Sequence, residues 1–323
     1  MSYQPPFTIT PAIIDLIAQI SEQVGRLSVQ PIHDLRLRRI NRIRTIQGSL
    51  AIEGNTLSET QITAVLDGKH VIAPPQDIQE VRNALLAYEQ MHTWNATDEK
   101  DLLQAHQILM TGLVDECGMY RQGGVGVMKG KEVMHIAPPA KRVPLLMRDL
   151  FLWLKSSAHH HLITSSVFHC EFEFIHPFSD GNGRMGRLWQ SLILQQWNPL
   201  FADIPIESLV HQHQADYYLA IQQSTEHIDA AYFVQFMLER ILDAMSFPQD
   251  TPQDSPQDTP PVERLLHVLK GEMSRDALQQ ALGLLDKKSF RQRYLLPALA
   301  HGKIEMTRPD KPNSKFQKYR KKG

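Results

Sequence analysis

Hydrophobic residues recur every three or four positions through most of the first 246 residues, which is the period of an amphipathic helix. The first such stretch is 10–27, where Thr10 is a candidate N-cap and Pro11 occupies the first helical position. In 58–68, Ser58 and Gln61 have the spacing of a capping box. The same period predicts further helices over 34–54, 75–94, 97–114, 143–157, 163–176, 183–197, 213–226 and 229–245. The pattern therefore predicts an all-α body.

One stretch, 120–140 ("YRQGGVGVMKGKEVMHIAPPA"), lacks the helical period. It combines short β-prone pieces with Gly123, Gly124, Gly126 and Gly130, which allow tight turns. We predict a hairpin or flap between helices; a plain connecting loop is the alternative.

A proline-rich repeat, 247–261 ("FPQDTPQDSPQDTPP"), separates two regions of opposite charge. Proline fixes φ and the aspartates repel one another, so we expect an extended spacer. After it, residues 262–323 carry fifteen Lys and Arg against six Asp and Glu, whereas 1–261 carry nineteen against twenty-nine. This split indicates two domains that face different partners, and a basic domain is suited to a polyanion. A solvated basic surface is the alternative.

The basic region shows three helical stretches followed by two β-prone stretches. Gly283 falls at the bend of a helix-turn-helix, and Pro309 and Pro312 interrupt the closing β-wing. This order predicts a small winged-helix domain. Its third helix would carry a cluster of basic side chains, namely Lys287, Lys288, Arg291 and Arg293.

The composition is ordinary for a soluble globular protein, with 42% hydrophobic and 21% charged residues. No run approaches the roughly 18 apolar residues of a membrane span, and the N-terminus lacks the basic-then-apolar order of a signal peptide. Cys117 and Cys170 are too few for a disulfide framework. We therefore expect a cytoplasmic protein with no membrane partner.

The segment 174–188 ("FIHPFSDGNGRMGRL") gathers several chemically active residues just before a predicted helix. Glycines at a helix start let the backbone approach an anion, and the free N–H groups and the helix dipole attract phosphate. Asn182 adds a side-chain amide, and Arg184 and Arg187 add positive charge three residues apart. Asp180 is a hard oxygen ligand suited to Mg²⁺, and His176 is suited to act as a general base near neutral pH.

Each of these residues alone has an ordinary structural explanation. A histidine near an apolar helix end is usually structural, an aspartate before glycine usually belongs to a turn, and an arginine pair is usually solvated. Their joint spacing is what points to metal-assisted attack on a bound nucleotide.

Residues 176–187, "HPFSDGNGRMGR", match the signature of Fic domains, H-P-F-x-(D/E)-G-N-(G/K)-R-x-x-R, at every defined position. The chain resembles this family over about residues 10–246, and its tail resembles the winged helix of some bacterial Fic proteins. The resemblance implies an all-α Fic-type core with a short β-hairpin flap, followed by a small winged-helix (α+β) domain. The implied domains are 1–110, with an inhibitory helix; 111–246, the catalytic core; 247–261, the linker; and 262–323, the winged helix-turn-helix.

The resemblance implies transfer of AMP from ATP to a Tyr, Thr or Ser hydroxyl of a target protein. His176 would take the hydroxyl proton, and Asp180 would hold Mg²⁺ on the α- and β-phosphates. Gly183 stands where relatives that transfer the γ-phosphate have lysine, which favours AMP transfer. The residues expected to bind ATP are Glu53, Gly181, Asn182, Gly183, Arg184, Met185, Gly186, Arg187, Tyr217 and Tyr218.

A second motif lies upstream in "SLAIEGN", 49–55. Self-inhibited Fic proteins carry (S/T)-x-x-x-E-(G/N), and Ser49, Glu53 and Gly54 have that register. By resemblance, Glu53 pairs with Arg187 and withholds it from the γ-phosphate, because one guanidinium cannot serve a carboxylate and a phosphate in the same place. For Glu53 alone, an ordinary carboxylate at a helix end is the alternative.

The resemblance also gives roles to two further regions. The flap would align the target by strand addition, with contacts near Val133, Met134, His135 and Ile136. Tyr217 and Tyr218 resemble a tyrosine pair that lines the nucleoside pocket, with core packing as the alternative. Thr225 stands where some relatives have an adenine-contacting asparagine, so that contact is not expected.

Two other functions fit the same residues. In one, Glu53 orients a water and the site hydrolyses AMP from a modified protein. In the other, the chain is a regulator that binds DNA through its tail and senses nucleotides with its core. The sequence leaves open the target protein, self-modification, a homodimer, and whether the tail binds DNA or protein.

Overall fold

The computed structural model describes residues 3–29, 35–124, 126–129 and 132–246, and, nearer the C-terminus, 265–266, 268–282, 290, 294–295, 298–299, 303–308 and 317–321. Of residues 29, 126–129, 132–136 and 246 it describes the backbone alone. The chain divides into two compact units, Met1–Pro248 and Gln249–Gly323, and each has its own hydrophobic core. The predicted linker and the predicted basic cluster of the tail lie outside the described residues.

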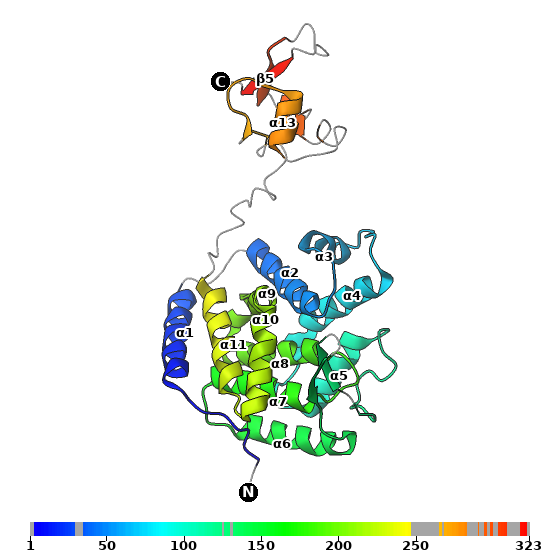
Figure 1. The fold of residues 1–323 in the computed structure, drawn as a ribbon, viewed down its shortest axis with the longest axis vertical. Helices are drawn as coiled ribbons and strands as arrows, with labels where there is room; N and C mark the ends of the chain where they lie inside the picture. The colour runs from blue at the N-terminus through cyan, green and yellow to red at the C-terminus, as the bar shows by residue number, and fades with distance from the viewer. Residues whose placement is uncertain are drawn as a thin grey trace. The chain divides into compact units, whose positions relative to one another are not determined.

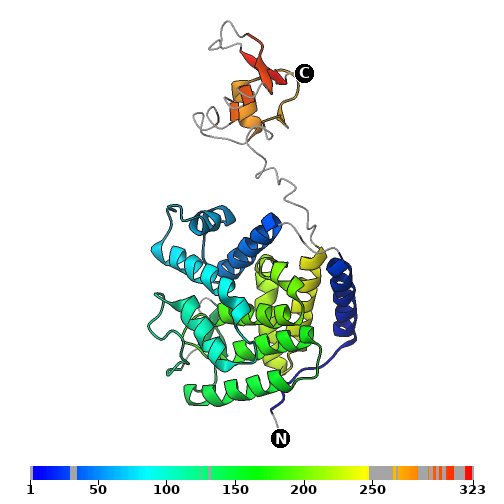
Figure 2. The same cartoon turned by 180° about the vertical axis from the view of Figure 1, so that it is seen from behind.

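The first unit is helical apart from one hairpin in its described part (Figures 1 and 2), and the predicted all-α class is confirmed. Its α-helices are α1 (Pro11–Val29), α2 (Leu35–Ile52), α3 (Glu59–Leu66), α4 (Pro75–Gln90), α5 (Glu99–Met110), α6 (Val143–Ser156), α7 (His161–Ile175), α8 (Asn182–Trp197), α9 (Ile206–Gln212), α10 (Gln214–His227) and α11 (Ala231–Ser246). Short 3-10 turns are η1 (Met91–Thr93), η2 (Ala140–Arg142) and η3 (Pro199–Asp203).

The predicted helix starts are confirmed at two places. The Ser58 hydroxyl accepts from the Gln61 N–H at 3.3 Å, while the Gln61 side chain accepts from the Ser58 N–H at 3.0 Å, which completes the capping box of α3. The Thr10 hydroxyl accepts from the Ile13 N–H at 3.2 Å, and Pro11 begins α1. Local sequence therefore determines where these helices begin.

Helices α7 and α8 lie in the middle of the helical unit (Figure 1). They approach closely because Gly186 on α8 has no side chain: a Cβ there would lie 2.6 Å from Cδ2 of His169 on α7. Large side chains fill the surrounding core, and Trp189 and Phe172 are fully buried. The segment 176–181, which joins α7 to α8, belongs to the 174–188 motif. The motif is therefore held between two largely buried helices.

Helix α2 packs just as closely on α9. A Cβ at Gly48 would lie 2.6 Å from the carbonyl carbon of Glu207, which only glycine can tolerate. This contact fixes the helix whose C-terminal end carries the predicted inhibitory residues.

The Gly-rich stretch forms the predicted hairpin. Strand β1 (Gly126–Lys129) pairs antiparallel with β2 (Glu132–Ile136), and the register is irregular between Val127 and Met128. The plain-loop alternative is therefore wrong.

The second unit contains β3 (Met273–Ser274), α13 (Arg275–Ala281), β4 (Ile304–Met306) and β5 (Lys318–Lys321). The strands form an antiparallel sheet in the order β3-β5-β4. Ser274 caps α13 by accepting from the Ala277 N–H at 3.2 Å. An α+β unit is thus confirmed. The winged helix itself stays a prediction, because most of its expected third helix lies outside the described residues.

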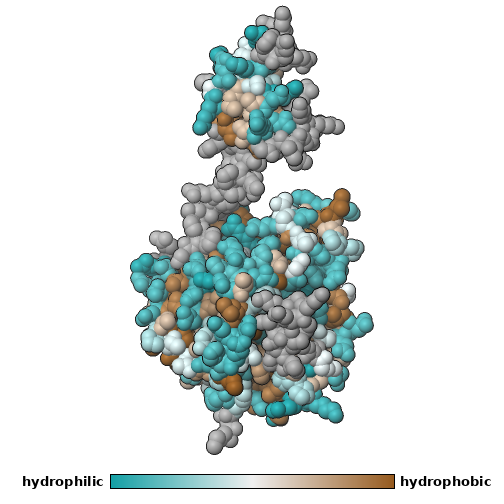
Figure 3. Space-filling view, in the orientation of Figure 1, coloured by the Kyte–Doolittle hydropathy of each residue, from teal (hydrophilic) through white to brown (hydrophobic). Residues whose placement is uncertain are grey.

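On the face shown in Figure 3, hydrophilic residues predominate and hydrophobic ones lie scattered among them. In the part of the chain that the structure describes, no helix combines the length and the apolar character that crossing a membrane requires.

Candidate functional site

Helix α7 ends at the motif histidine. The His176 N–H closes the last turn by donating to the Phe172 carbonyl at 2.8 Å, and the His176 backbone is left-handed with φ 50°. This conformation costs a non-glycine residue about 1–2 kcal/mol, so neighbouring contacts have to hold it. The turn presents the partly exposed imidazole beside the loop that leads into α8.

Arg121, which sequence reasoning missed, stabilises this turn through hydrogen bonds to backbone carbonyls. Its buried guanidinium donates from Nε to the His176 carbonyl at 2.7 Å, from Nη1 to the Gly123 carbonyl at 2.9 Å, and from Nη2 to the Pro138 carbonyl at 2.6 Å. Gly123 precedes the hairpin and Pro138 follows it. One side chain therefore ties both ends of the flap to the end of α7.

Asn182 closes the motif loop on itself. Its Oδ1 accepts from the Phe178 N–H and its Nδ2 donates to the Phe178 carbonyl, both at 2.9 Å. The side chain is 2% exposed and bonded within the loop, so in this structure its amide shapes the loop. Asn182 can still offer its backbone N–H.

His106 on α5 supports the same loop and was also missed. Its ring stacks on Phe178 with centroids 3.6 Å apart. Nδ1 accepts from the Gly118 N–H at 2.9 Å, so Nε2 carries the proton that is donated to the Asp180 carbonyl at 3.1 Å. Burial is the main reason that the pKa of His106 falls to about 4, so the ring is neutral and the tautomer is fixed.

The depressed pKa of His106 predicts a loss of stability in mild acid. The unfolded histidine takes a proton as the pH falls through about 6.5 while the folded one resists until about pH 4, so protonation favours unfolding. Between pH 7 and pH 5 the cost is about 2 kcal/mol. Denaturant unfolding followed by tryptophan fluorescence measures it, because all four tryptophans lie in the helical unit. His106→Gln, which does not titrate, should lose about 2 kcal/mol less than wild type over this interval; equal losses would contradict the assignment.

The start of α8 has the properties of an anion site. Gly181 is left-handed with φ 80°, and a Cβ there would lie 2.5 Å from Sδ of Met110. The first bond inside the helix runs from the Met185 N–H to the Gly181 carbonyl at 2.9 Å. The N–H groups of Asn182, Gly183 and Arg184 consequently have no partner within the helix, and the dipole of α8 adds to their pull on an anion.

Three residues expected to bind ATP lie in the core of this structure, and their contact with ATP stays a prediction. Met185 is fully buried and its N–H is used by the helix, while Gly186 faces His169 on α7. Tyr217 is 1% exposed, and its hydroxyl bonds to Nε2 of His169 at 3.1 Å. These residues pack in the core, which for Tyr217 was the stated alternative. Tyr218 is half-buried and remains a candidate pocket residue.

Arg184 lies between two carboxylates. Nη1 is 3.3 Å from Glu80 on α4 and Nη2 is 3.4 Å from Asp180. Glu80 also accepts from the side chain of Asn55 at 2.8 Å, so α4 links the motif to the residues that follow α2. Glu80 is a further neighbour of the site that sequence reasoning missed.

Glu53 and Arg187 form the ion pair that the upstream motif predicted. Glu53 Oε1 lies 2.6 Å from Nη2 of Arg187, which is 1% exposed. Ser49 accepts from Arg187 through its hydroxyl at 3.1 Å and through its carbonyl at 3.0 Å. Burial opposes the charge, but the Glu53 carboxylate outweighs it and raises the pKa of Arg187. Among the described residues, the buried Nη1 of Arg187 has no hydrogen-bond partner.

Glycine at position 183 makes room for this ion pair. A Cβ there would lie 2.3 Å from Glu53 Oε1 and 3.0 Å from Nη1 of Arg187. A lysine at this position would therefore be incompatible with Glu53 in its present place.

The end of α2 is held by two side chains of α10. Gln214 donates to the Ile52 carbonyl at 2.8 Å and Tyr218 donates to it at 3.4 Å. Gly54 follows with φ 94°, a conformation that favours glycine. These two bonds from α10 fix the helix end that positions Glu53.

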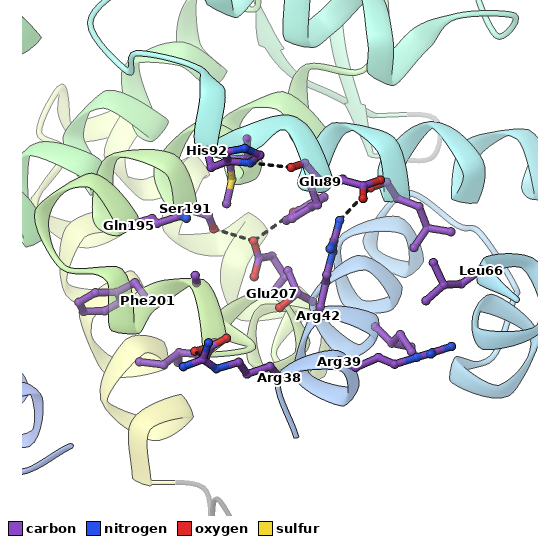
Figure 4. Close-up of a pocket in the computed structure, with 18 of the residues that line it drawn as sticks. Arg38, Arg39, Arg42, Leu66, Glu89, His92, Ser191, Gln195, Phe201 and Glu207 are labelled. Atoms are coloured by element: carbon purple, nitrogen blue, oxygen red, sulfur yellow. Dashed lines mark hydrogen bonds and ion pairs between the residues drawn. The ribbon is translucent and has the colours of Figure 1, made fainter. Parts of the chain in front are cut away.

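A cleft of about 610 Å³ lies against the N-terminal half of α2, and no residue of the 174–188 motif lines it (Figure 4). Its inner side carries Glu207, whose carboxylate accepts from Ser191 at 2.7 Å and from Tyr88 at 3.2 Å. Arg42 crosses from α2 to the Leu85 carbonyl of α4 at 3.2 Å. The cleft is therefore separate from the anion site.

A smaller cavity of about 330 Å³ is lined in part by Thr225 and Phe174.

The residues present are compatible with Mg²⁺ bound together with a nucleotide. Among the described residues, no group of three or more His, Cys, Asp or Glu is arranged to hold a metal by itself. Asp180 offers a carboxylate whose side chain is 59% exposed, next to the free N–H groups of α8. Phosphate oxygens would have to supply the other ligands, as is usual for Mg²⁺.

Two family models match this chain, one over part of its helical unit and one over its C-terminal region. The family model "Fic/DOC family" matches residues 96–194, and "Filamentation induced by cAMP protein Fic-like, C-terminal domain" matches residues 260–321. A crystal structure of a Fic family protein from Desulfovibrio desulfuricans G20 is 52% identical with a TM-score of 0.73, and 99% of each chain is covered. This chain belongs to the Fic family.

Curated relatives carry the name "Protein adenylyltransferase Fic". The protein of Aedes aegypti is 31% identical over 217 residues, which are 62% of this chain and 41% of that protein. The protein of Nematostella vectensis is 27% identical over 248 residues, which are 71% of this chain and 55% of that protein. The chain thus spans about half the length of the curated relatives it matches.

Proposed function

We propose that this Fic protein is a self-inhibited protein adenylyltransferase that uses ATP and Mg²⁺ to move AMP onto a Tyr, Thr or Ser hydroxyl of a target protein. The observation that carries the proposal is the ion pair of Glu53 with Arg187, which lies against Gly183 in the first turn of α8. The names of the curated relatives support the activity.

In the proposed reaction His176 removes the proton from the target hydroxyl, and the hydroxyl oxygen attacks the α-phosphorus of ATP. The bond from that phosphorus to the bridging oxygen breaks, and pyrophosphate leaves. The N–H groups at the start of α8 and the Arg184 guanidinium neutralise phosphate charge. Mg²⁺ held by Asp180 would add to this neutralisation. Neutralising that charge is what lowers the barrier to phosphoryl and nucleotidyl transfer.

Inhibition follows from competition for Arg187. While Glu53 holds Nη2, the guanidinium is not free to hold the γ-phosphate, so ATP is poorly aligned for in-line attack. Because Ser49 also accepts from Arg187, movement of the end of α2 would remove both restraints together. Ser49, Glu53 and Gly54 would therefore act as one inhibitory element.

The flap and the tail complete the proposal. Strand β2 carries Val133–Ile136, and its backbone would align an extended target segment by strand addition. The basic C-terminal unit would bind a polyanion such as DNA, or a protein, and would recruit the target or place the enzyme. The chain is proposed to act in the cytoplasm, alone or as a homodimer.

Radiolabelled ATP tests the proposed reaction. Full-length Glu53→Gly protein is incubated with cell lysate, Mg²⁺ and ATP labelled at either the α- or the γ-phosphate. We expect labelled protein bands, or a self-modified chain that is heavier by one AMP, only with the α-label. Label from the γ-phosphate would mean phosphoryl transfer, and no label from either position would refute the proposal. Release of AMP from modified lysate proteins by wild type would instead favour the hydrolase.

A further inference from the structure

On α7, one turn before the motif histidine, lies a buried carboxylate, Glu173, that the family signature does not include. Glu173 lies one turn before His176, and its side chain is 9% exposed. Its Oε2 is 3.9 Å from Nδ1 of His176. A carboxylate this deep in a helical core is costly unless it compensates a charge.

The room for this carboxylate comes from the motif itself. A Cβ at Gly186 would lie 3.0 Å from Glu173 Oε1, so even an alanine would crowd the carboxylate. This gives Gly186 a role that the ATP-binding assignment did not explain. In the part of the chain that the structure describes, Glu173 Oε1 has no hydrogen-bond partner.

His169, the other histidine beside Glu173, is already engaged. Its Nδ1 is 2.6 Å from the Gln190 amide oxygen, so Nδ1 carries the proton. Its Nε2 then accepts from the Tyr217 hydroxyl at 3.1 Å, and it lies 3.7 Å from Glu173 Oε1. His169 is therefore held by Gln190 and Tyr217 on both ring nitrogens. His176 is the second histidine within 4 Å of the carboxylate, and it is the one that belongs to the motif.

We propose that Glu173 is a positioning residue that orients His176 through Nδ1 and makes it a stronger base. This inference rests on the proposed function of His176 as general base. When His176 takes the hydroxyl proton from the target it becomes an imidazolium, and the adjacent carboxylate stabilises that charge. A long contact of this kind commonly shortens when substrate binds.

Other charged and titratable groups face Glu173 from each packed helix. They are His169 and Cys170 on α7, Arg187 on α8, Tyr217 and Tyr218 on α10, and, through Arg187, Glu53 at the end of α2. Burial raises the pKa of Glu173, but His169, His176 and Arg187 outweigh it and the net pKa is lowered. An ionised carboxylate within about 4–6 Å raises the pKa of an imidazole by about one to three units, so its loss should lower the pKa of His176.

The test measures the pKa of His176 directly and then the reaction. In the Glu53→Gly background, the imidazole of His176 is titrated by NMR, with His176→Ala used to assign its signal. We expect Glu173→Gln to lower the His176 pKa by about one unit or more. Glu171→Gln is the matched control, because Glu171 lies on the same helix but bonds to Tyr3, and it should cause no shift. An unchanged His176 pKa in Glu173→Gln overturns the inference, whether or not AMP is transferred.

The reaction provides a second readout. The rate of AMP transfer falls in acid as His176 is protonated, so Glu173→Gln should move the acidic midpoint to lower pH by the same amount. The maximal rate should fall about tenfold, because the base is weaker and less well oriented, while the KM for ATP should not change. If Glu173→Gln does not fold, Glu173→Asp keeps the charge with a shorter side chain and should give a smaller shift. A KM increase without a pH shift would indicate a purely structural role and would contradict the inference.

Discussion

Glu53→Gly is expected to raise AMP transfer about 10- to 100-fold over wild type. The substitution removes a charge-assisted hydrogen bond at 2.6 Å from a guanidinium that is 1% exposed. Such bonds contribute about 1.5–3 kcal/mol, and ATP has to overcome this amount before its γ-phosphate can take Arg187. Glycine is compatible with the backbone because the residue lies beyond the end of α2.

Two further measurements separate release of Arg187 from a general loosening of the chain. Mg²⁺ with ATP should raise the melting temperature of Glu53→Gly more than that of wild type, because tighter ligand binding stabilises the folded state more. Adding Arg187→Ala to Glu53→Gly should remove the gain, since the freed guanidinium is what ATP uses. Glu59→Gln changes a surface carboxylate paired with Arg44 and should leave the rate unchanged. Equal rates in Glu53→Gly and wild type would refute inhibition by this ion pair.

The resemblance to Fic domains predicted the Glu53–Arg187 pair, although 134 positions separate the two residues. Each end lies in a short motif whose residue types are dictated by local chemistry: glycines where a helix must receive an anion, and a carboxylate before a Gly-Asn turn. Helix starts were predictable for the same reason, because Ser58 and Gln61 satisfy each other within one turn. What a segment does by itself can be deduced from that segment.

The supporting residues could not be found this way. His106, Arg121 and Glu80 act through backbone carbonyls or side chains that belong to distant segments, and each stands alone in an ordinary helix or turn. A single arginine before a Gly-rich stretch has no local signature that predicts four carbonyl partners. Only the folded chain shows that Gly123 and Pro138 lie close enough to share one guanidinium.

Burial separates the residues of the nucleotide motif into different surroundings. Helix α8 offers its first N–H groups at its N-terminal end and packs one side against α7, so neighbouring residues of the motif face different surroundings once the helix forms. Met185 and Gly186 lie on the packed side, and Tyr217 bonds to a histidine of the core. The side of a helix that a ligand meets depends on its neighbours, which the motif does not contain.

His176→Ala in the Glu53→Gly background is expected to lower the rate of AMP transfer by about 10²- to 10⁴-fold, the usual contribution of a general base. The affinity for ATP should not change, because the anion site at the start of α8 uses backbone N–H groups and arginines. The loop should also keep its shape, since Arg121 holds the backbone carbonyl of residue 176 and not its side chain.

The outcome therefore distinguishes loss of a base from collapse of the site. His227→Ala, an exposed histidine of α10, serves as the control and should retain the activity of Glu53→Gly. Isothermal titration with a non-hydrolysable ATP analogue measures affinity without chemistry. If His176→Ala keeps the full rate, the proton leaves by another route and His176 is not the base. If both rate and affinity fall together, the imidazole supports nucleotide binding instead, and the division of labour between α7 and α8 argued above is wrong.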